Sequence, residues 1–375
     1  MLKRKLTYAM IGGAKGSFIG PIHRSAIRID DLATLVAGCF SRDIDRNLGT
    51  GEKLAIPIDR VYNDWKSLIA AEVGKVDFLV ICTTNESHYP IAKAALKAGM
   101  DVVCEKPLSL TAREAAELER LARRQGAILM VPFTYTGFPM VKLARDLVKK
   151  GELGKIDKIV MEYQQGSFRK IDFSKPLDKH NSWKMNPKIA GPSCVVADIG
   201  VHAFTMVEYV TGLEIKSLLA DLSSFAPGNR LDDDASFLMR LADGAKACML
   251  VSKVATGEEN GMRLRVYGDK ASLFWEQERP NYLSVKYPFK PEMIYKRNAP
   301  YIESLSLRSK RSSRIPAGHH EGFVEALTNI YDEYCAAVLT RRVTDHPGAR
   351  EGVRYMRFVE AALKSAKAGA TWTKV

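Results

Sequence analysis

The first third of the chain alternates short apolar runs with helix-like segments, and this alternation limits the possible folds more than any other feature. Strand-length apolar runs occur at 6–11, 32–40, 76–82, 101–104 and 127–131, with helix-like segments at 21–30, at 86–98 and after Thr111. Glu114 lies three residues after Thr111, which is the spacing of a capping box. Alternation of this kind predicts a doubly wound α/β fold with a parallel sheet.

The pattern changes after Pro132. A helix is predicted at 138–150, another at 201–210, and two amphipathic helices close the chain at 321–339 and 348–368. Strands are predicted at 155–166, 214–225, 234–241, 246–254, 262–267 and 271–277. The turn dipeptides Asp243-Gly244 and Gly268-Asp269 help to separate the last four, which indicates an antiparallel meander. We therefore expect two domains, an α/β domain over 1–132 and an α+β domain over 133–375.

Composition narrows the class of protein. A length of 375 residues fits two domains, each with its own core. The net charge of +13 permits nucleic-acid binding, but the densest basic run, 308–314, lacks interleaved aromatic residues, and a basic surface also attracts anionic cofactors. No window approaches the ~20 apolar residues of a membrane span. The six cysteines are dispersed without metal-ligand spacing, so we expect reduced thiols, no metal site and a cytoplasmic protein.

A glycine-rich loop follows the first predicted strand. Gly12, Gly13, Gly16 and Gly20 would allow positive φ angles and a close approach of backbone N–H groups to a pyrophosphate at the start of the next helix. The loop is longer than G-x-G-x-x-G, as if about three residues were inserted. A generic glycine turn is the alternative, but the place of the loop between the first strand and helix favours nucleotide binding.

The end of the second predicted strand should contact the cofactor ribose. NAD enzymes usually place an acidic residue there, whereas NADP enzymes favour a small residue with an arginine. Ser41 and Arg42 could hold a 2′-phosphate, while Asp43 could be the acidic residue of an NAD enzyme. We favour NADP over NAD and leave Asp43 as the alternative.

Polar residues also follow the third and fourth predicted strands. The run 83–85 and His88 should lie near the nicotinamide half of the cofactor, although Asn85 could equally cap the next helix. Lys106 comes directly after a buried strand, at the edge where open α/β sheets bind ligands, and could bond a reacting hydroxyl. Glu105 beside it would be structural.

A second candidate pair lies in the run 191–202. Asp198 and His202 are four residues apart, about one helical turn, although Gly200 makes that turn irregular. A lone histidine on a helix is more often a packed residue. The aspartate partner, together with Lys106 elsewhere in the chain, favours a proton-transfer site.

These motifs together resemble those of the Gfo/Idh/MocA oxidoreductase family over essentially the full length. The matching residues are the loop ending Phe18-Ile19-Gly20 with His23, then Thr83-Thr84-Asn85 with His88, then Glu105-Lys106-Pro107, and finally Asp198-x-Gly200-x-His202. The resemblance implies that Lys106, Asp198 and His202 are catalytic. It also implies a Rossmann NAD(P)-binding domain and a second domain whose open antiparallel sheet serves substrate binding and oligomer contacts.

Three features depart from the family pattern. The glycine loop is longer than usual, and Thr84 replaces a common proline. The run Phe133-Thr134-Tyr135-Thr136 stands where many members carry an Asn-Arg pair, so the usual substrate contacts do not carry over.

The predicted activity is NAD(P)-dependent hydride transfer at a secondary alcohol or ketone of a sugar, glycoside or cyclitol. His202 would be the general base, Lys106 would bond the same oxygen, and Asp198 would orient His202 or a neighbouring hydroxyl; Lys106 as the base is the alternative. We predict substrate contacts from Tyr135, Gln165, Trp183, Lys184, Asp198 and His202. We predict cofactor contacts from Gly12, Gly13, Lys15, Gly16, Ser17, Phe18, Ile19, Ser41, Arg42, Thr83, Thr84, Asn85, His88, Glu105 and Lys106. Two rival functions are a non-catalytic NAD(P)-binding sensor and a dihydrodiol-type dehydrogenase of a non-sugar substrate.

We also expect a homodimer or homotetramer joined through the second domain's sheet. Ala235, Phe237, Met239 and Leu241 share one side of a predicted strand, and the run 247–251 is apolar on both sides. Pairing two such faces would bury a large apolar patch. The alternative is that the chain's own helices cover them.

Overall fold

The computed structural model describes residues 4–171 and 179–375. The chain forms two compact units. The first contains the chain up to Phe133 together with Leu327–Val353, and the second contains Thr134–Ala326 together with Arg354–Val375. The chain therefore returns to the first unit near its C-terminus.

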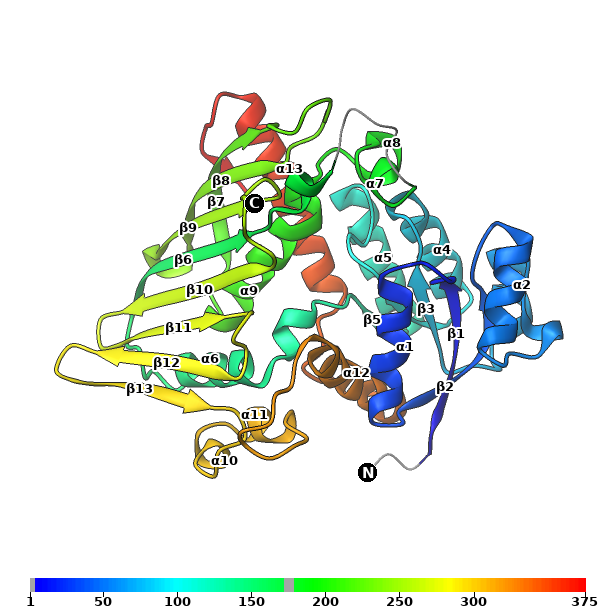
Figure 1. Cartoon of the computed structure of the whole chain (residues 1–375), viewed down its shortest axis with the longest axis horizontal. Helices are drawn as coiled ribbons and strands as arrows, with labels where there is room; N and C mark the ends of the chain where they lie inside the picture. Colours follow the sequence, from blue (N-terminus) through cyan, green and yellow to red (C-terminus); the bar gives the residue numbers. More distant parts are fainter. Residues whose placement is uncertain (1–3, 172–178) are drawn as a thin grey trace. The chain divides into compact units, whose positions relative to one another are not determined.

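The first unit contains a five-stranded parallel sheet with strand order β2-β1-β3-β4-β5 (Figure 1). Its strands are β1 (Leu6–Gly12), β2 (Ala33–Cys39), β3 (Phe78–Cys82), β4 (Asp101–Cys104) and β5 (Leu129–Met130). Strands β3 and β4 are buried throughout, as expected for a parallel sheet with both faces covered. The predicted doubly wound α/β fold is confirmed.

Helices connect these strands. They are α1 (Ile19–Ile29), α2 (Ile44–Lys53), α3 (Trp65–Glu72), α4 (Asn85–Lys97) and α5 (Ala112–Gln125), with a 3₁₀ turn η1 (Ile58–Arg60). The predicted cap of α5 is confirmed, because the Thr111 side chain accepts a hydrogen bond from the Glu114 amide at 3.2 Å. The prediction that Asn85 caps α4 is wrong by one residue: the N-cap position belongs to Thr84.

The C-terminal part of the first unit holds most of α12 (Phe323–Thr340) and the start of α13 (Ala349–Lys367). The Thr328 hydroxyl donates to the carbonyl of Ala26 in α1 at 3.0 Å. The ring of Tyr334 packs edge-on against Phe78 of β3, with ring centres 5.4 Å apart. Helix α12 therefore belongs to the core of the first unit.

The second unit contains a nine-stranded, mostly antiparallel sheet with strand order β13-β12-β11-β10-β6-β9-β8-β7-β14 (Figure 1). Its strands are β6 (Ile156–Gln164), β7 (Ile215–Ser223), β8 (Asp234–Leu241), β9 (Lys246–Ser252), β10 (Gly261–Gly268), β11 (Ser272–Glu276), β12 (Tyr282–Tyr287), β13 (Lys290–Lys296) and β14 (Thr373–Lys374). The predicted meander of four successive strands is wrong, because β6 lies between β9 and β10 and pairs parallel with β9.

The remaining elements of the second unit are short turns and helices around this sheet. The longer helices are α6 (Pro139–Lys149) and α9 (Val201–Thr211); the shorter ones are η2 (Thr134–Gly137), η3 (Ser167–Lys170), α7 (Lys179–Lys184), α8 (Pro187–Ala190), the π-helical turn η4 (Val196–Gly200), η5 (Ala242–Gly244), α10 (Ile302–Leu305) and α11 (Leu307–Arg311). Helix α13 packs on one face of the sheet, since Phe358 stacks on Phe204 of α9 and lies 5.3 Å from the ring of Phe237 in β8.

This packing corrects one sequence prediction. The side of β8 that carries Ala235, Phe237, Met239 and Leu241 is buried, and the chain's own helices cover it. The opposite side carries Leu238, which is half exposed. Any face that the sheet offers to another subunit is therefore the side of Leu238.

Three further observations concern the described residues. No helix among them is long and apolar enough to cross a membrane. All six cysteines are free, and five of them are buried. Within the same ranges, no group of three His, Cys, Asp or Glu side chains has an arrangement that could hold a metal ion.

Candidate active site

The glycine loop in the first unit is built for close packing. Gly12, Gly13 and Gly16 have φ angles of 84°, 73° and 83°, which favour glycine. A methyl group at Gly12 would lie 2.4 Å from the carbonyl oxygen of Cys82, and one at Gly20 would lie 2.3 Å from the Cα atom of Gly13. Side chains at these positions would push the loop off β3 and off the start of α1.

The same loop fits a dinucleotide. Helix α1 starts at Ile19, so its first backbone N–H groups lack intrahelical partners. The buried hydroxyl of Ser17 has no hydrogen-bond partner within the described parts of the chain, whereas the Phe18 ring is exposed. A helix start with an unsatisfied hydroxyl beside it suits a phosphate group.

The segment after β2 is hydrogen-bonded to the glycine loop. Asp43 caps α2 by accepting from the Arg46 amide at 2.9 Å, and Ser41 accepts from the Asp43 amide at 3.1 Å. The Arg46 guanidinium donates to the carbonyl of Lys15 at 2.9 Å. Arg42 is exposed, and its side chain has no ion pair in the part of the chain that the structure describes. Arg42 is thus a cation open to a ligand, while Asp43 already caps a helix.

The loop after β3 is held by internal hydrogen bonds. Both ring nitrogens of His88 face backbone carbonyls, that of Pro107 at 2.7 Å and that of Thr83 at 3.1 Å. Thr84 donates through its hydroxyl to Glu86 at 2.8 Å. Burial lowers the pKa of His88. His88 therefore joins the loop after β3 to the loop after β4.

Glu105 and Lys106 follow β4 directly, as predicted. Oε1 of Glu105 lies 2.9 Å from Nε2 of the buried His23, and Oε2 accepts from the Lys106 amide at 3.2 Å. Nδ1 of His23 lies 2.7 Å from the hydroxyl of Tyr331 in α12. Lys106 itself is half-buried, and its bond to Pro107 is cis. These hydrogen bonds give Glu105 the structural role that the sequence predicts for it.

In the second unit, Asp198 and His202 lie in two consecutive helical segments of different geometry. Asp198 lies in the π-helical turn η4, and His202 lies in α9, which follows it without a break. The buried carboxylate of Asp232 fixes the start of η4 by accepting from the Val196 amide at 3.0 Å and from the Ser193 hydroxyl at 2.8 Å. Single π-helical turns of this kind are often found at functional sites. The predicted irregular turn at Gly200 is therefore confirmed as a π-helical turn.

Two lysines face the Asp198 carboxylate. Nζ of Lys253 lies 2.5 Å from Oδ2 of Asp198, and Nζ of Lys184 lies 3.9 Å from the same atom. Burial by itself lowers the pKa of Lys253, but the neighbouring groups, with the charge of Asp198 foremost, together outweigh it, so the pKa is raised. Lys184 is among the residues predicted from the sequence, whereas Lys253 is not. Its only sequence signal is a lysine directly after an apolar strand, as for Lys106.

An aromatic and amide cluster surrounds His202. The ring of Tyr135 packs edge-on against the His202 ring with centres 5.1 Å apart, and its hydroxyl lies 2.5 Å from that of Tyr163. Tyr163 donates to Asn260 at 2.7 Å, and the amide of Gln165 donates to the same Asn260 oxygen at 3.0 Å. Burial raises the pKa of both tyrosines, so both hydroxyls stay protonated.

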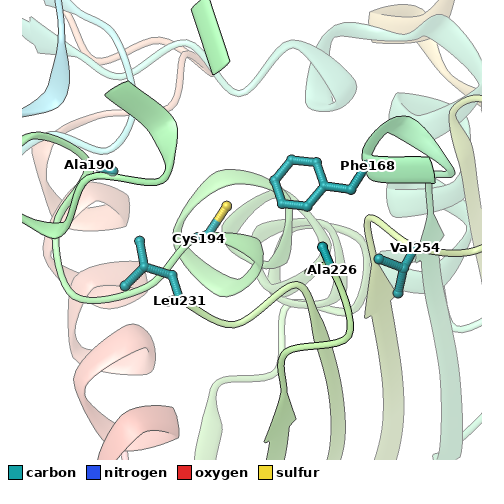
Figure 2. Packing of buried hydrophobic residues seen from close by; sticks show 6 residues of the cluster. All are labelled: Phe168, Ala190, Cys194, Ala226, Leu231 and Val254. Carbon is teal, nitrogen blue, oxygen red and sulfur yellow. The ribbon is translucent and has the colours of Figure 1, made fainter. Parts of the chain in front are cut away.

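Trp183, the remaining residue of the predicted substrate wall, lies against a small apolar cluster near Asp198. Figure 2 shows the six buried side chains of this cluster: Phe168, Ala190, Cys194, Ala226, Leu231 and Val254. Trp183 is partly buried against them, and the Lys184 ammonium group lies 5.9 Å from the centre of its ring. The second unit therefore brings all six predicted substrate residues into two adjoining groups, around His202 and around Asp198.

The first unit defines a dinucleotide-binding oxidoreductase domain, and the comparisons with known proteins agree. Residues 6–133 match the oxidoreductase family with an NAD-binding Rossmann fold, and residues 141–274 match the GFO/IDH/MocA C-terminal domain. The chain is also 32% identical to the uncharacterized oxidoreductase YfiI of Bacillus subtilis over 389 residues, which covers 100% of this chain and 98% of YfiI. The chain belongs to the Gfo/Idh/MocA oxidoreductase family, with an NAD-binding Rossmann fold in its first unit.

Two further relatives have names that refer to dehydrogenases. The crystal structure of an inositol dehydrogenase homolog from Azotobacter vinelandii with NAD⁺ has a TM-score of 0.93 at 32% identity, covering 100% of this chain and 98% of that one. The same homolog was solved with NADH and myo-inositol. The levoglucosan dehydrogenase of Pseudarthrobacter phenanthrenivorans is 28% identical over 249 residues, 60% of this chain and 61% of that protein.

Proposed function

We propose that this oxidoreductase transfers hydride between a nicotinamide cofactor and a secondary alcohol or ketone of a sugar, glycoside or cyclitol. The observation that carries the proposal is the cluster around His202, where the rings of Tyr135 and Tyr163 contact the imidazole. The Tyr163 hydroxyl joins a hydrogen-bond network with the amides of Asn260 and Gln165. Aromatic side chains stack on sugar rings, and polar side chains recognise hydroxyl groups through hydrogen bonds. The inositol dehydrogenase homolog solved with myo-inositol and the levoglucosan dehydrogenase support this substrate class.

The proposed roles follow from the chemistry of each group. A bound nicotinamide would supply the hydride acceptor. His202 would take the hydroxyl proton of the substrate, because an imidazole can exchange protons near neutral pH. Lys106 would donate a hydrogen bond to the same oxygen and stabilise its developing negative charge. Asp198 would hold a substrate hydroxyl or orient His202.

Cofactor preference is the finer part of the proposal. We propose that Ser41 and Arg42 contact the adenosine ribose of the cofactor and favour NADP. Support comes from the exposed Arg42 guanidinium and from the helix-capping use of Asp43. The relative solved with NAD⁺ supports the opposite choice, in which Asp43 bonds the 2′-hydroxyl. Kd values for both cofactors would separate the two.

We also propose a homo-oligomer, joined through the sheet face that carries Leu238, and a cytoplasmic location, which the free cysteines support. Strand register places one row of side chains across this face. The row runs through Leu219, Leu238, Cys248, Val160, Arg265, Phe274, Ser284 and Ile294. All are at least partly exposed and six of the eight are apolar, so a second copy would bury a continuous stripe.

The proposed activity is tested with a substrate panel. Purified protein is incubated with NAD⁺ or NADP⁺ and, separately, with myo-inositol, levoglucosan and a set of free sugars and glycosides, while the absorbance of the reduced nicotinamide is followed. We expect reduced cofactor with at least one cyclic polyol, matched by an equal amount of ketone product. Cofactor binding without reduction by any member of the panel would contradict the proposal.

A further inference from the structure

Lys253 is a buried lysine to which neither the sequence motifs nor the family resemblance assigns a role. It follows the last residue of β9, and its backbone is held on both sides. Its amide donates to the carbonyl of Asp233 at 2.8 Å, and its carbonyl accepts from the Phe168 amide at 2.9 Å. Its side chain is only 3% exposed. The position of the ammonium group is therefore fixed by the sheet.

A buried ammonium group is costly unless it is paired, and Lys253 is paired with Asp198. The Asp198 side chain is 30% exposed, so its carboxylate contacts the buried lysine and also reaches solvent. The Lys253 ammonium group also lies 5.2 Å from the centre of the Phe168 ring. A methionine would fill this space with no charge to desolvate. Burying the charged lysine therefore costs desolvation free energy that an apolar side chain of similar volume would not cost.

The charges around this ion pair come from several elements. Lys184 of α7 faces the same Asp198 oxygen, and the buried Asp232 lies close enough to act on the pKa of Lys253. Cys194 is also nearby, but burial raises the pKa of its thiol to about 12, so it is neutral near pH 7. The negative charge of Asp198 also acts on the hydroxyls of Tyr135 and Tyr163, whose rings contact His202. The negative charge of Asp198 therefore acts electrostatically on the two tyrosines that contact His202.

Resting on the proposed dehydrogenase function, we propose that Lys253 is a positioning residue of the substrate site: its ammonium group fixes the Asp198 carboxylate and offsets its negative charge beside His202. A general base works best when its pKa lies near the working pH. An uncompensated carboxylate nearby would favour the protonated imidazole. Lys253 therefore keeps His202 available as a proton acceptor while Asp198 remains ionised.

The test separates charge from packing with three substitutions. Lys253→Met removes the charge at similar volume, Lys253→Gln removes the charge but keeps a hydrogen-bond donor, and Lys253→Arg keeps the charge. Lys246→Met, at the exposed start of β9, is the matched control. The readout is the protonation midpoint of His202, followed by NMR of ¹³C-labelled histidine rings in the full-length protein without substrate. The His202→Gln variant assigns the signal.

We expect Lys253→Met and Lys253→Gln to raise the His202 midpoint by about 0.5–1 pH unit, with the arginine and Lys246 variants unchanged. The acid limb of kcat/KM against pH should move by the same amount, with kcat/KM at neutral pH about 2- to 3-fold lower. A midpoint unchanged in a folded Lys253→Gln or Lys253→Met variant would overturn the proposal. A shifted midpoint in a protein that oxidises no member of the panel would support the Lys253 assignment and refute the dehydrogenase function.

Discussion

Nε2 of His23 lies 2.9 Å from Oε1 of Glu105, inside the core of the first unit. The ring's other nitrogen lies 2.7 Å from the hydroxyl of Tyr331. His23 comes from α1, Glu105 from the end of β4 and Tyr331 from α12, so one imidazole joins three segments that are distant in sequence. Because Glu105 also accepts the amide of Lys106, this ion pair fixes the loop that carries the proposed catalytic lysine.

Removing one member of this pair should destabilise the first unit. We expect His23→Gln to lower the free energy of unfolding by about 3 kcal/mol, because a buried carboxylate would lose its cation. Tyr331→Phe removes only a hydrogen bond and should cost about 1 kcal/mol. Urea denaturation followed by far-UV circular dichroism measures both. Equal, small losses in the two variants would show that the His23–Glu105 pair is not ionised.

The same pair predicts a pH dependence of stability. Burial lowers the pKa of His23, but Cys82 and the Glu105 carboxylate raise it, and the net direction is upward. Burial also raises the pKa of Cys82, so that thiol is neutral near pH 7 and Glu105 supplies the charge.

A raised histidine pKa stabilises the fold fully below about pH 6.5, the pKa of an unfolded histidine. The contribution is lost as the pH rises through the higher pKa of the folded state. We therefore expect the difference in unfolding free energy between wild type and His23→Gln to shrink steadily above about pH 6.5. A difference that grows with pH would contradict the direction of the shift.

Much of the first unit is predictable from sequence because its signals are local. The apolar run 101–104 matches β4 at both ends, and Thr111 caps α5 as expected. Helix α2 was missed because it is polar and α3 because it is short, although Asp43 and Asp64 at their N-caps were readable signals.

The second unit was less predictable because its key contacts are non-local. Strand β6 pairs with β9, which is separated from it by α9, β7 and β8, so no turn signal marks the pairing. Lys253 lies 55 residues after Asp198, and nothing in the sequence near either residue indicates that they meet. The hairpin of β12 and β13 was missed because β13 is mostly exposed and has little burial to create an alternating pattern.

Cofactor choice should depend on Arg42. If its guanidinium group bonds a 2′-phosphate, Arg42→Ala should weaken NADPH binding by at least about 10-fold and change NADH binding little. Asp43→Asn is the companion variant, since it should weaken NADH selectively if Asp43 bonds the ribose. Fluorescence titration with each reduced cofactor gives the Kd values. An equal effect of Arg42→Ala on both cofactors would favour Asp43 as the ribose contact.

The proposed oligomer should depend on Leu238. It is 50% exposed and lies in the apolar row on the open sheet face, between Leu219 and Cys248. Leu238→Glu places a charge in that row, and we expect it to shift the protein toward a 41.7 kDa monomer in sedimentation experiments at micromolar concentration. Ile58→Glu changes a more exposed apolar residue in the first unit and serves as the control. A wild-type protein that already sediments as a monomer would contradict the oligomer.

The most direct test of the account is the turnover of Lys106→Ala and His202→Ala with the best substrate of the panel, measured beside their affinity for the reduced cofactor. Proton transfer by a positioned side chain contributes at least about 100-fold. The account predicts a loss of kcat of that size in each variant, with cofactor Kd changed by less than about 3-fold. Turnover near the wild-type rate in either variant would remove that residue from the chemistry and contradict the proposed site.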